Sequence, residues 1–396
     1  MVLDKKNIRA YSILGAIISG KFVEPLFIPF IALNVFVKYK IRTSRKLMFL
    51  FLSVFVYSLL IDICTKYPID KLIQQSLVLF VLFISYDLIF KNFKSNIDFL
   101  YRRYFDISFL CSIIGLIQFA VYFFWKKNIF SFITADFQDY SVIRVSALFV
   151  EPGYLAQFLI PAAATIILSD VYRKQKKIRS IFIFLCGFLT FSPVFYFSVF
   201  LILVIHFLSK YNNLLVRFFL LILSIFVAFL MWNALTANYQ SNSGSFMGQL
   251  NTKIVESSKI ITISNPHDID DLNYSSFALA SNFYVAVHAP YRFLGTGLGS
   301  HGYNYKTVYT NVTLKSTLND IDGYSLLNRI LSEFGYVGLF LYLFWIIHFF
   351  NKKNIINISV LFYILSLFLR GGNYFMYGIV FFHFLYYYTS LKKTRK

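Results

Sequence analysis

The sequence has little charge, few acidic residues and almost no cysteine. Only 14% of its 396 residues are charged, and 18 acidic side chains stand against 38 basic ones. A soluble domain carries about 25% charged and about 45–50% apolar residues, whereas this chain is 58% apolar. Its three cysteines, Cys64, Cys111 and Cys186, have no paired spacing, which argues against a disulfide framework or a cysteine-ligated metal. A soluble single-core protein is therefore excluded.

Long apolar runs fill the chain instead, with a mean hydropathy of +0.64. A bilayer core about 30 Å thick needs about 17–25 apolar residues in a helix. We predict an all-α, polytopic membrane bundle. Its twelve candidate spans are residues 8–21, 24–39, 46–64, 71–90, 103–125, 145–169, 178–191, 192–209, 214–232, 333–350, 355–370 and 373–389. The first two candidate spans are short. An alternative interpretation is that they form one broken helix and a stretch at the membrane interface.

The positions of the basic residues indicate which loops are cytoplasmic. If the N-terminus is cytoplasmic, most Lys and Arg fall in the short inside loops, as the positive-inside rule requires. We therefore predict that both termini are cytoplasmic. The formal net charge of +20 is accounted for in this way, and no nucleic-acid partner is expected.

One connection is long. Residues 233–332 are rich in Asn, Ser, Thr, Tyr and Gly, and the topology places them outside. Such a long connection is usually functional or disordered, and its aromatic content argues against plain disorder. We predict three parts: a bundle of about nine spans at 1–232, an extracytoplasmic loop at 233–332, and the last three spans with a basic tail at 333–396.

The loop contains a predicted amphipathic helix from Ser275 to Ala289, ended by Pro290. Its apolar face would consist of Phe277, Phe283, Tyr284 and Val287, and such a helix can lie on a membrane surface. No internal repeat relates the two halves of the chain.

Glu151 is a charged residue inside a predicted span, where charge is costly and marks a functional candidate. Pro152 and Gly153 follow it, so we expect the helix to break there and to expose polar backbone to a cavity. A salt bridge to a neighbouring helix is the alternative explanation.

Four arginines are predicted on the outer side of a chain that keeps most of its positive charge inside. An outer cluster of arginines indicates an anionic partner, because guanidinium groups bind phosphate oxygens in bidentate fashion. For each one, contact with lipid headgroups is the alternative. They are Arg144, Arg292, Arg329 and Arg370.

The loop also contains a run of alternating glycines at 295, 297 and 299. Such a run permits a nest of backbone donors around an anion. His301 follows it, and an outward-facing histidine can act as a general base, although a structural role is the more common one. Asn304 closes the run and is a candidate for binding the substrate.

A second motif follows at Asp320, Asp322 and Tyr324 and leads into Arg329 and Glu333. The two aspartates are similar to an Asp-x-Asp metal clamp, but two residues are a weak motif and we predict no metal and no cofactor. Arg329 and Glu333 are four residues apart, so an ion pair on one helix face explains them without chemistry. Tyr324 is a candidate for glycan binding.

Taken in order, these motifs resemble the bacterial O-antigen polymerase and ligase superfamily over about residues 140–350. They are the broken span 144–154, the glycine run after Arg292, and the segment 324–335. The chain looks most like a Wzy-type oligosaccharide repeat-unit polymerase. The resemblance implies an all-helical glycosyltransferase related to the GT-C type, working at the outer face of the bacterial cytoplasmic membrane.

The resemblance also implies a reaction. A glycan would leave undecaprenyl pyrophosphate when a hydroxyl of a second lipid-linked repeat unit attacks its anomeric carbon. Arg144 and Arg292 would stabilise the leaving diphosphate, supported by Arg329 and Arg370. Glu151 is the first candidate for the base, and Glu333 and His301 are the second. The implied partners are the lipid-linked oligosaccharide, the bilayer, and the chain-length regulator and flippase of the same pathway.

Two alternative functions remain beside the polymerase. One is the ligase branch, whose members usually carry a His-Asn pair before the helix that leaves the loop. Here the corresponding residues are Asp322, Gly323 and Tyr324, which favours the polymerase. The other is a flippase, although transporters are usually built from repeated halves with sites near the midplane.

Overall fold

The protein was analysed as a computed structural model. It describes residues 5–18, 45–65, 67, 69–93, 96–130, 143–211, 216, 222–223, 233, 272, 274–309, 319–375 and 378–391.

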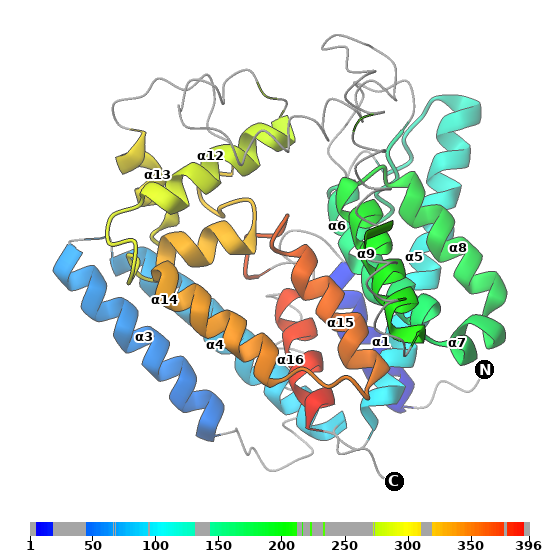
Figure 1. The fold of residues 1–396 in the computed structure, drawn as a ribbon, viewed down its shortest axis with the longest axis horizontal. Coiled ribbons are helices and arrows are strands. Elements are labelled where there is room, and N and C mark those ends of the chain that lie inside the picture. The colour runs from blue at the N-terminus through cyan, green and yellow to red at the C-terminus, as the bar shows by residue number, and fades with distance from the viewer. Residues whose placement is uncertain are drawn as a thin grey trace. The chain divides into compact units, whose positions relative to one another are not determined.

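The described part of the chain is all-helical and contains no strand, which confirms the predicted fold class (Figure 1). The helices are α1 (Lys5–Ile18), α3 (Arg45–Thr65), α4 (Ile69–Phe93), α5 (Ile97–Trp125), α6 (Pro152–Leu168), α7 (Asp170–Gln175), α8 (Lys177–Leu189), α9 (Pro193–Lys210), α12 (Tyr274–His288), α13 (His301–Val308), α14 (Leu326–His348), α15 (Ile355–Ser366) and α16 (Ile379–Ser390).

Within the described residues, four helices are long and apolar enough to cross a membrane: α4, α5, α9 and α14. Shorter apolar helices occur at Met48–Cys64, Pro152–Leu168 and Ile355–Ser366. These helices indicate a membrane protein. Each predicted span that falls within the described residues coincides with a helix. The other two predicted spans cannot be compared, because residues 24–39 and most of 214–232 lie outside the described residues. The count of twelve therefore stays a prediction.

Prolines set two of the helix starts. Pro152 is the first residue of α6 and Pro193 the first of α9, where the missing N–H costs no helical hydrogen bond. Residues 178–209 are therefore two helices, as predicted, and not one kinked helix. The predicted break at Pro152 is also confirmed. The outer part of the predicted span 145–169 is not helical, because residues 143–151 form turns and extended backbone.

The chain divides into two compact units, and the boundary falls inside α5. Unit 1 comprises Met1–Ile107 and Ser264–Lys396, and unit 2 comprises Ser108–Ile263. This division follows packing. The predicted division at residues 232 and 332 follows membrane topology and stays a prediction.

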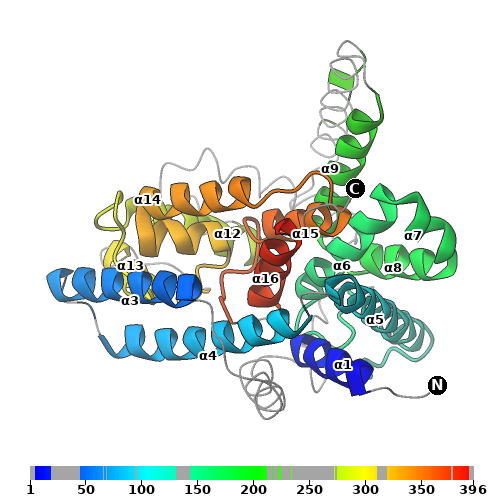
Figure 2. The same cartoon turned by 90° about the horizontal axis from the view of Figure 1, so that it is seen from below.

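Unit 1 is built around aromatic packing between distant segments. Helix α16 packs against α15 and α4, and Tyr86 and Phe90 of α4 contact the rings of Phe381 and Phe384. Asp87 of α4 accepts a hydrogen bond of 2.9 Å from the Tyr388 hydroxyl. Figure 2 shows α3 and α4 lying side by side, and the two helices are in contact.

The predicted loop helix exists as α12, but its buried face differs from the expected one. Of the four predicted apolar residues only Phe277 is buried, whereas Phe283, Tyr284 and Val287 are partly exposed. Helix α12 packs closely against α14 and α13, and close helix contact favours small side chains. Its buried residues are Ser276, Phe277, Ala278, Ala280, Ser281, Asn282, Val285 and Ala286.

Unit 2 is organised around α6, which packs against α8 and α9. Nearly every residue of α6 is buried, as expected for a helix that is apolar on all sides. The preceding segment is held by Gln118 of α5. Its Oε1 accepts from the backbone N–H groups of Ser146 and Ala147, at 3.0 and 2.9 Å. This side chain replaces the helical hydrogen bonds that residues 143–151 lack.

Candidate functional site

Helix α14 contains a sharp kink at Gly335. The residue has φ 63° and ψ −165°, a region that essentially only glycine enters. Figure 1 shows the two pieces of α14 running in different directions. The first piece, which carries Arg329 and Glu333, is therefore separate from the apolar second piece.

The glycine run docks onto this kink through its backbone. Thr296 and Gly297 donate to the Glu333 carbonyl oxygen, at 3.0 and 2.8 Å. A Cβ on Gly295 would collide with the same carbonyl, and a Cβ on Gly335 would collide with the carbonyl of Phe293. Glycine is required at both positions because two backbones meet there without side chains between them.

This docking corrects the prediction of an anion nest. Gly295 donates its N–H to the Tyr291 carbonyl, Ser300 donates to the Gly297 carbonyl, and Leu298 donates to the Ser58 hydroxyl at 3.1 Å. The N–H groups of residues 295–298 and 300 are thus bonded within the protein. The run positions two segments and does not hold an anion with these donors.

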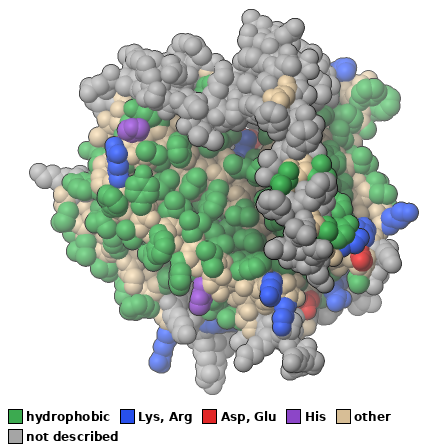
Figure 3. Space-filling model, viewed as in Figure 1, with side chains coloured by type: hydrophobic (Ala, Val, Ile, Leu, Met, Phe, Trp, Pro, Cys, Tyr) green, Lys and Arg blue, Asp and Glu red, His purple; other side chains and the backbone are tan. Residues whose placement is uncertain are grey.

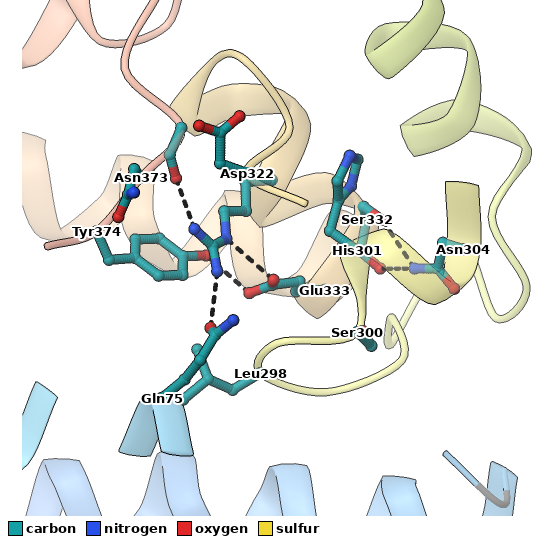
Figure 4. Close-up of polar contacts among 12 residues, drawn as sticks. Gln75, Leu298, Ser300, His301, Asn304, Asp322, Ser332, Glu333, Asn373 and Tyr374 are labelled. Carbon is teal, nitrogen blue, oxygen red and sulfur yellow. Dashed lines mark hydrogen bonds and ion pairs between the residues drawn. The ribbon is translucent and has the colours of Figure 1, made fainter. Parts of the chain in front are cut away.

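Arg329 lies at the centre of a buried network, and 2% of the residue is exposed. Figure 4 shows Gln75, Glu333 and Tyr374 pointing toward one another, and all three contact the guanidinium group of Arg329. Nε donates to Glu333 Oε1 at 3.0 Å, Nη1 to the Gly372 carbonyl at 3.0 Å and Nη2 to Gln75 Oε1 at 2.7 Å. The guanidinium carbon lies 4.0 Å from the centre of the Tyr374 ring.

Glu333 has both carboxylate oxygens engaged. Oε1 accepts from Arg329, and Oε2 accepts from the Tyr374 hydroxyl at 3.0 Å. A buried ion pair of this kind is tolerated when every remaining donor and acceptor is satisfied. Arg329 and Glu333 therefore join α4, α14 and the segment that begins at Arg370, which supports the interpretation of them as an ion pair.

Two loops pair at the start of α14. The Tyr324 carbonyl accepts from Gly371 at 2.8 Å and from Gly372 at 3.2 Å. Arg370 is partly exposed, donates to the Tyr324 hydroxyl at 3.4 Å and lies 5.4 Å from its ring. Burial raises the pKa of the Asp322 carboxyl, an effect opposed by the Tyr324 N–H and the Arg329 charge. The structure thus brings Tyr324, Arg329, Glu333 and Arg370 together.

Asn304 is fully buried and acts as a hub. Its Nδ2 donates to Thr296 Oγ1 at 2.7 Å and to Ser332 Oγ at 2.7 Å, and its Oδ1 accepts from the Tyr67 hydroxyl. The predicted glycan contact is therefore occupied by the protein in this structure.

His301 was expected to face outward, and this is wrong, because the residue is fully buried. The Asn282 amide fixes its tautomer: Asn282 Nδ2 donates to the Ala278 carbonyl at 2.6 Å, so Oδ1 faces His301 Nε2 at 2.8 Å. Nε2 must then carry the proton. Burial and the Arg329 charge lower the pKa of His301 to about 3, so the ring is neutral at physiological pH and a poor general base.

Arg292 differs from the other arginines of unit 1, because its side chain is exposed. No described residue makes an ion pair or a side-chain hydrogen bond with it. Its backbone is fixed, since the Arg292 carbonyl accepts from Tyr336 at 2.9 Å and the Phe293 carbonyl from Val337 at 3.0 Å. Arg292 is thus an accessible cation at the kink of α14.

Arg144 and Glu151 belong to unit 2. Arg144 is 8% exposed and donates to the carbonyl oxygens of Thr190 and Phe191, at 3.2 and 3.3 Å. It therefore caps the C-terminal end of α8, where a cation is favourable. Glu151 is the residue before the first turn of α6, with extended backbone and a partly exposed side chain.

Sequence reasoning missed Asp62, Gln75 and Asn282. Asp62 is a buried carboxylate in an apolar helix, and its Oδ1 would lie 2.6 Å from a Cβ on Gly297. Its signal was available, because a charge inside a predicted span is exceptional. No comparable signal marked Gln75 or Asn282, which are common residue types.

The described residues contain no group of three or more His, Cys, Asp or Glu side chains that could hold a metal ion. Fold and site together define an all-helical protein with membrane-type apolar helices and a buried ion-pair cluster. No protein-family model, curated protein or solved structure matches the chain.

Proposed function

We propose that the chain is a glycosyltransferase of the bacterial cytoplasmic membrane, a Wzy-type polymerase of surface polysaccharide. It would transfer a growing glycan from undecaprenyl pyrophosphate onto a new lipid-linked repeat unit at the outer face of the membrane. In this proposal the chain has about twelve spans, a GT-C-like arrangement, and both termini in the cytoplasm.

One observation carries the proposal. Two motifs that are about 30 residues apart, the glycine run and the segment 324–335, are joined by backbone hydrogen bonds at the kink of α14. Their junction encloses a desolvated ion pair and leaves the Arg292 cation exposed beside an apolar helix. An enzyme that acts on lipid-linked diphosphates needs a rigid polar frame and an accessible cation at the edge of the membrane.

The proposed step breaks the bond between the anomeric carbon and the lipid diphosphate and forms a bond to an acceptor hydroxyl oxygen. The hydroxyl proton passes to a base, and the diphosphate leaves with its bonding electrons. Exposed Arg292 and partly exposed Arg370 would stabilise the negative charge on the leaving group. Arg329 and Arg144 are assigned to the frame, because their guanidinium groups already bind protein oxygens.

Glu151 of unit 2 remains the first candidate for the base on the sequence argument alone, as a charged residue in a predicted span. Glu333 is assigned to the frame, since both of its oxygens accept hydrogen bonds. His301 is assigned a structural role, because it is buried and its pKa lies far below neutrality.

The direct test is a gel of surface polysaccharide from the source strain with the gene deleted and then restored. The proposal predicts that the deletion leaves single repeat units on the acceptor, because flipping and ligation continue, and that restoration returns the long chains. A chain-length distribution that does not change on deletion would contradict the polymerase.

Loss of every repeat unit would also contradict it and would favour one of the rivals. Outward accumulation of lipid-linked polymer would then select the ligase. Unpolymerised units trapped on the inner side would select the flippase.

A further inference from the structure

The turn formed by Tyr291, Arg292, Phe293 and Leu294 projects four large side chains, and all four are exposed. Tyr291 and Phe293 are 60% and 72% exposed and adjoin exposed Leu294, so the turn adds apolar surface of the kind that can meet a lipid or a ligand. We call these residues the 291–294 turn.

The 291–294 turn is rigid although it is exposed. Two backbone hydrogen bonds join it to Tyr336 and Val337 directly after the kink of α14. From the other side, the hydroxyl of Tyr57 on α3 donates to the Leu294 carbonyl. Tyr291 has φ 58°, a left-handed conformation that costs free energy in a non-glycine residue. Such strain in a pinned, exposed turn is typical of a functional position.

An apolar stripe begins where the turn is attached. Its residues recur at spacings of one, three and four along the second piece of α14, so they form one helix face. We call this stripe the α14 lipid face: it consists of Tyr336, Val337, Phe340, Leu341, Phe344 and Ile347, which are 43% exposed or more. Figure 3 shows hydrophobic side chains over the area where α3 and α14 are drawn in Figure 1.

The charge at the upper end of this face is positive. The 291–294 turn and residues 336–348 contain no acidic residue, and the neighbouring carboxylate of Glu333 is buried and paired with Arg329. Arg292 is thus a fixed cation at the end of an apolar track, which matches a lipid whose anionic head sits at the membrane edge and whose chain runs along the helix.

We propose that the α14 lipid face with Arg292 binds the isoprenoid diphosphate carrier, the chain along the face and the diphosphate at the guanidinium group. A diphosphate offers adjacent phosphate oxygens to the planar guanidinium fork, and the pinned turn holds that fork in advance, which lowers the cost of binding. This inference rests on the proposed function, because the carrier is its substrate. Bulk phospholipid is the competing occupant.

The test uses the purified full chain in phosphatidylcholine nanodiscs, with the photoreactive substitution Phe340→p-benzoylphenylalanine. Tritiated undecaprenyl diphosphate is the probe. We expect light-dependent labelling of the protein, and this labelling should fall at least tenfold in Arg292→Gln. Excess geranylgeranyl diphosphate should displace the probe. Geranylgeraniol, which lacks the phosphates, should not displace the label.

Two controls match this design. Lys353→Gln removes an exposed positive charge beyond the opposite end of α14 and should leave labelling unchanged. The same photoreactive group at Ile178, which is 69% exposed on α8, should label weakly and without dependence on Arg292. An unchanged thermal unfolding temperature of Arg292→Gln would show that the variant is folded.

Two results would overturn the proposal and make the face an ordinary lipid contact. One is labelling that stays the same in Arg292→Gln. The other is displacement of the label by phosphatidylglycerol as effectively as by geranylgeranyl diphosphate. The outcome is separate from that of the polysaccharide gel. If labelling depends on Arg292 but the polysaccharide is unchanged after gene deletion, the lipid site is supported and the polymerase function is contradicted. Loss of long chains after deletion without such labelling would do the reverse.

Discussion

The start of α14 in unit 1 and the start of α6 in unit 2 are built on the same plan. In each, a non-helical segment precedes an apolar helix, and a buried arginine binds carbonyl oxygens of a distant segment. Arg329 binds the Gly372 carbonyl together with a carboxylate and an amide, whereas Arg144 binds only the carbonyls at the end of α8 among the contacts described above.

The difference between the two junctions lies in what they leave exposed. The α14 junction encloses its ion pair and presents a second arginine, Arg292, on a pinned turn. The α6 junction buries its arginine and places the partly exposed residue Glu151 at the helix start, with carboxylate oxygen Oε2 buried. A buried arginine with bonded nitrogens thus holds each junction together, whereas Arg292 beside the α14 junction is exposed.

The largest effect is expected at the kink of α14. Gly335→Ala would place a Cβ against the Phe293 carbonyl in a backbone region that alanine avoids. We expect a loss of about 3 kcal/mol or more, from strain and overpacking together, measured by thermal unfolding in detergent. Gly15→Ala in α1 is the control, since nothing lies within 4 Å of its Cβ. A Gly335→Ala protein as stable as this control would contradict the backbone docking.

The two buried arginines should differ in cost. Arg329→Met leaves the Glu333 carboxylate buried without its partner, and breaking such a pair costs about 3–5 kcal/mol. Among the contacts described above, Arg144→Met leaves neutral carbonyl oxygens behind, at about 1–3 kcal/mol. Chemical unfolding of both variants checks the order. Adding Glu333→Gln to Arg329→Met should recover part of the loss, and equal costs for the two arginines would remove the distinction between the junctions.

Each junction also depends on one buried glutamine. Gln118→Leu removes the acceptor of two backbone N–H groups, those of Ser146 and Ala147, whereas Gln75→Leu removes the acceptor of one Arg329 nitrogen. Each buried group left without a partner costs about 1–3 kcal/mol. We expect the larger loss of stability for Gln118→Leu, and proteolysis at the 143–151 segment should rise only in that variant.

A smaller effect is expected from pH at the α14 junction. His301 has a pKa of about 3 in the folded protein, so on acidification the unfolded chain, with a pKa of about 6.5, binds the proton first. Stability is therefore unaffected by this group above about pH 7 and falls by about 1.4 kcal/mol per pH unit below about pH 6.

His301→Gln keeps a donor for Asn282 and removes this proton, so the contribution of His301 to the pH dependence should disappear. The raised pKa of Asp322 acts in the opposite direction, since an unfolded carboxyl loses its proton first as the pH rises. That contribution is common to both proteins and cancels when they are compared. The same change in unfolding free energy between pH 7 and pH 5 in the parent protein and in His301→Gln would contradict this assignment.

The smallest effect on stability is expected at Arg292. Arg292→Gln should change the unfolding free energy by no more than about 0.5 kcal/mol, as is usual for an exposed side chain. Its activity should nevertheless be lost. A large loss of stability would show that Arg292 belongs to the frame, like Arg329 and Arg144.

The helical architecture could be predicted because its signals are local. Apolar runs, Pro152 and Pro193 act within one or two turns of themselves, and within the described residues they gave helices or helix starts where these were expected. The broken span before Glu151 was visible for the same reason.

The site could be predicted only in part, because its geometry depends on contacts between distant segments. Arg144 and Arg292 look alike in the sequence, yet one is buried against α8 and the other is exposed. His301 appears as an outward loop histidine, and only its contact with Asn282 on α12 shows otherwise. Gln75 carries no local signal, since its role arises from Arg329, 254 residues away.

The central claim is that buried arginines hold the frame while Arg292 meets the lipid-linked substrate. The most direct measurement is the surface-polysaccharide gel of the deletion strain restored with Arg292→Gln, with membrane expression and unfolding temperature measured on the same variant. We predict parental expression and stability together with single repeat units in place of long chains. Full-length polysaccharide from a stable Arg292→Gln protein would contradict the account.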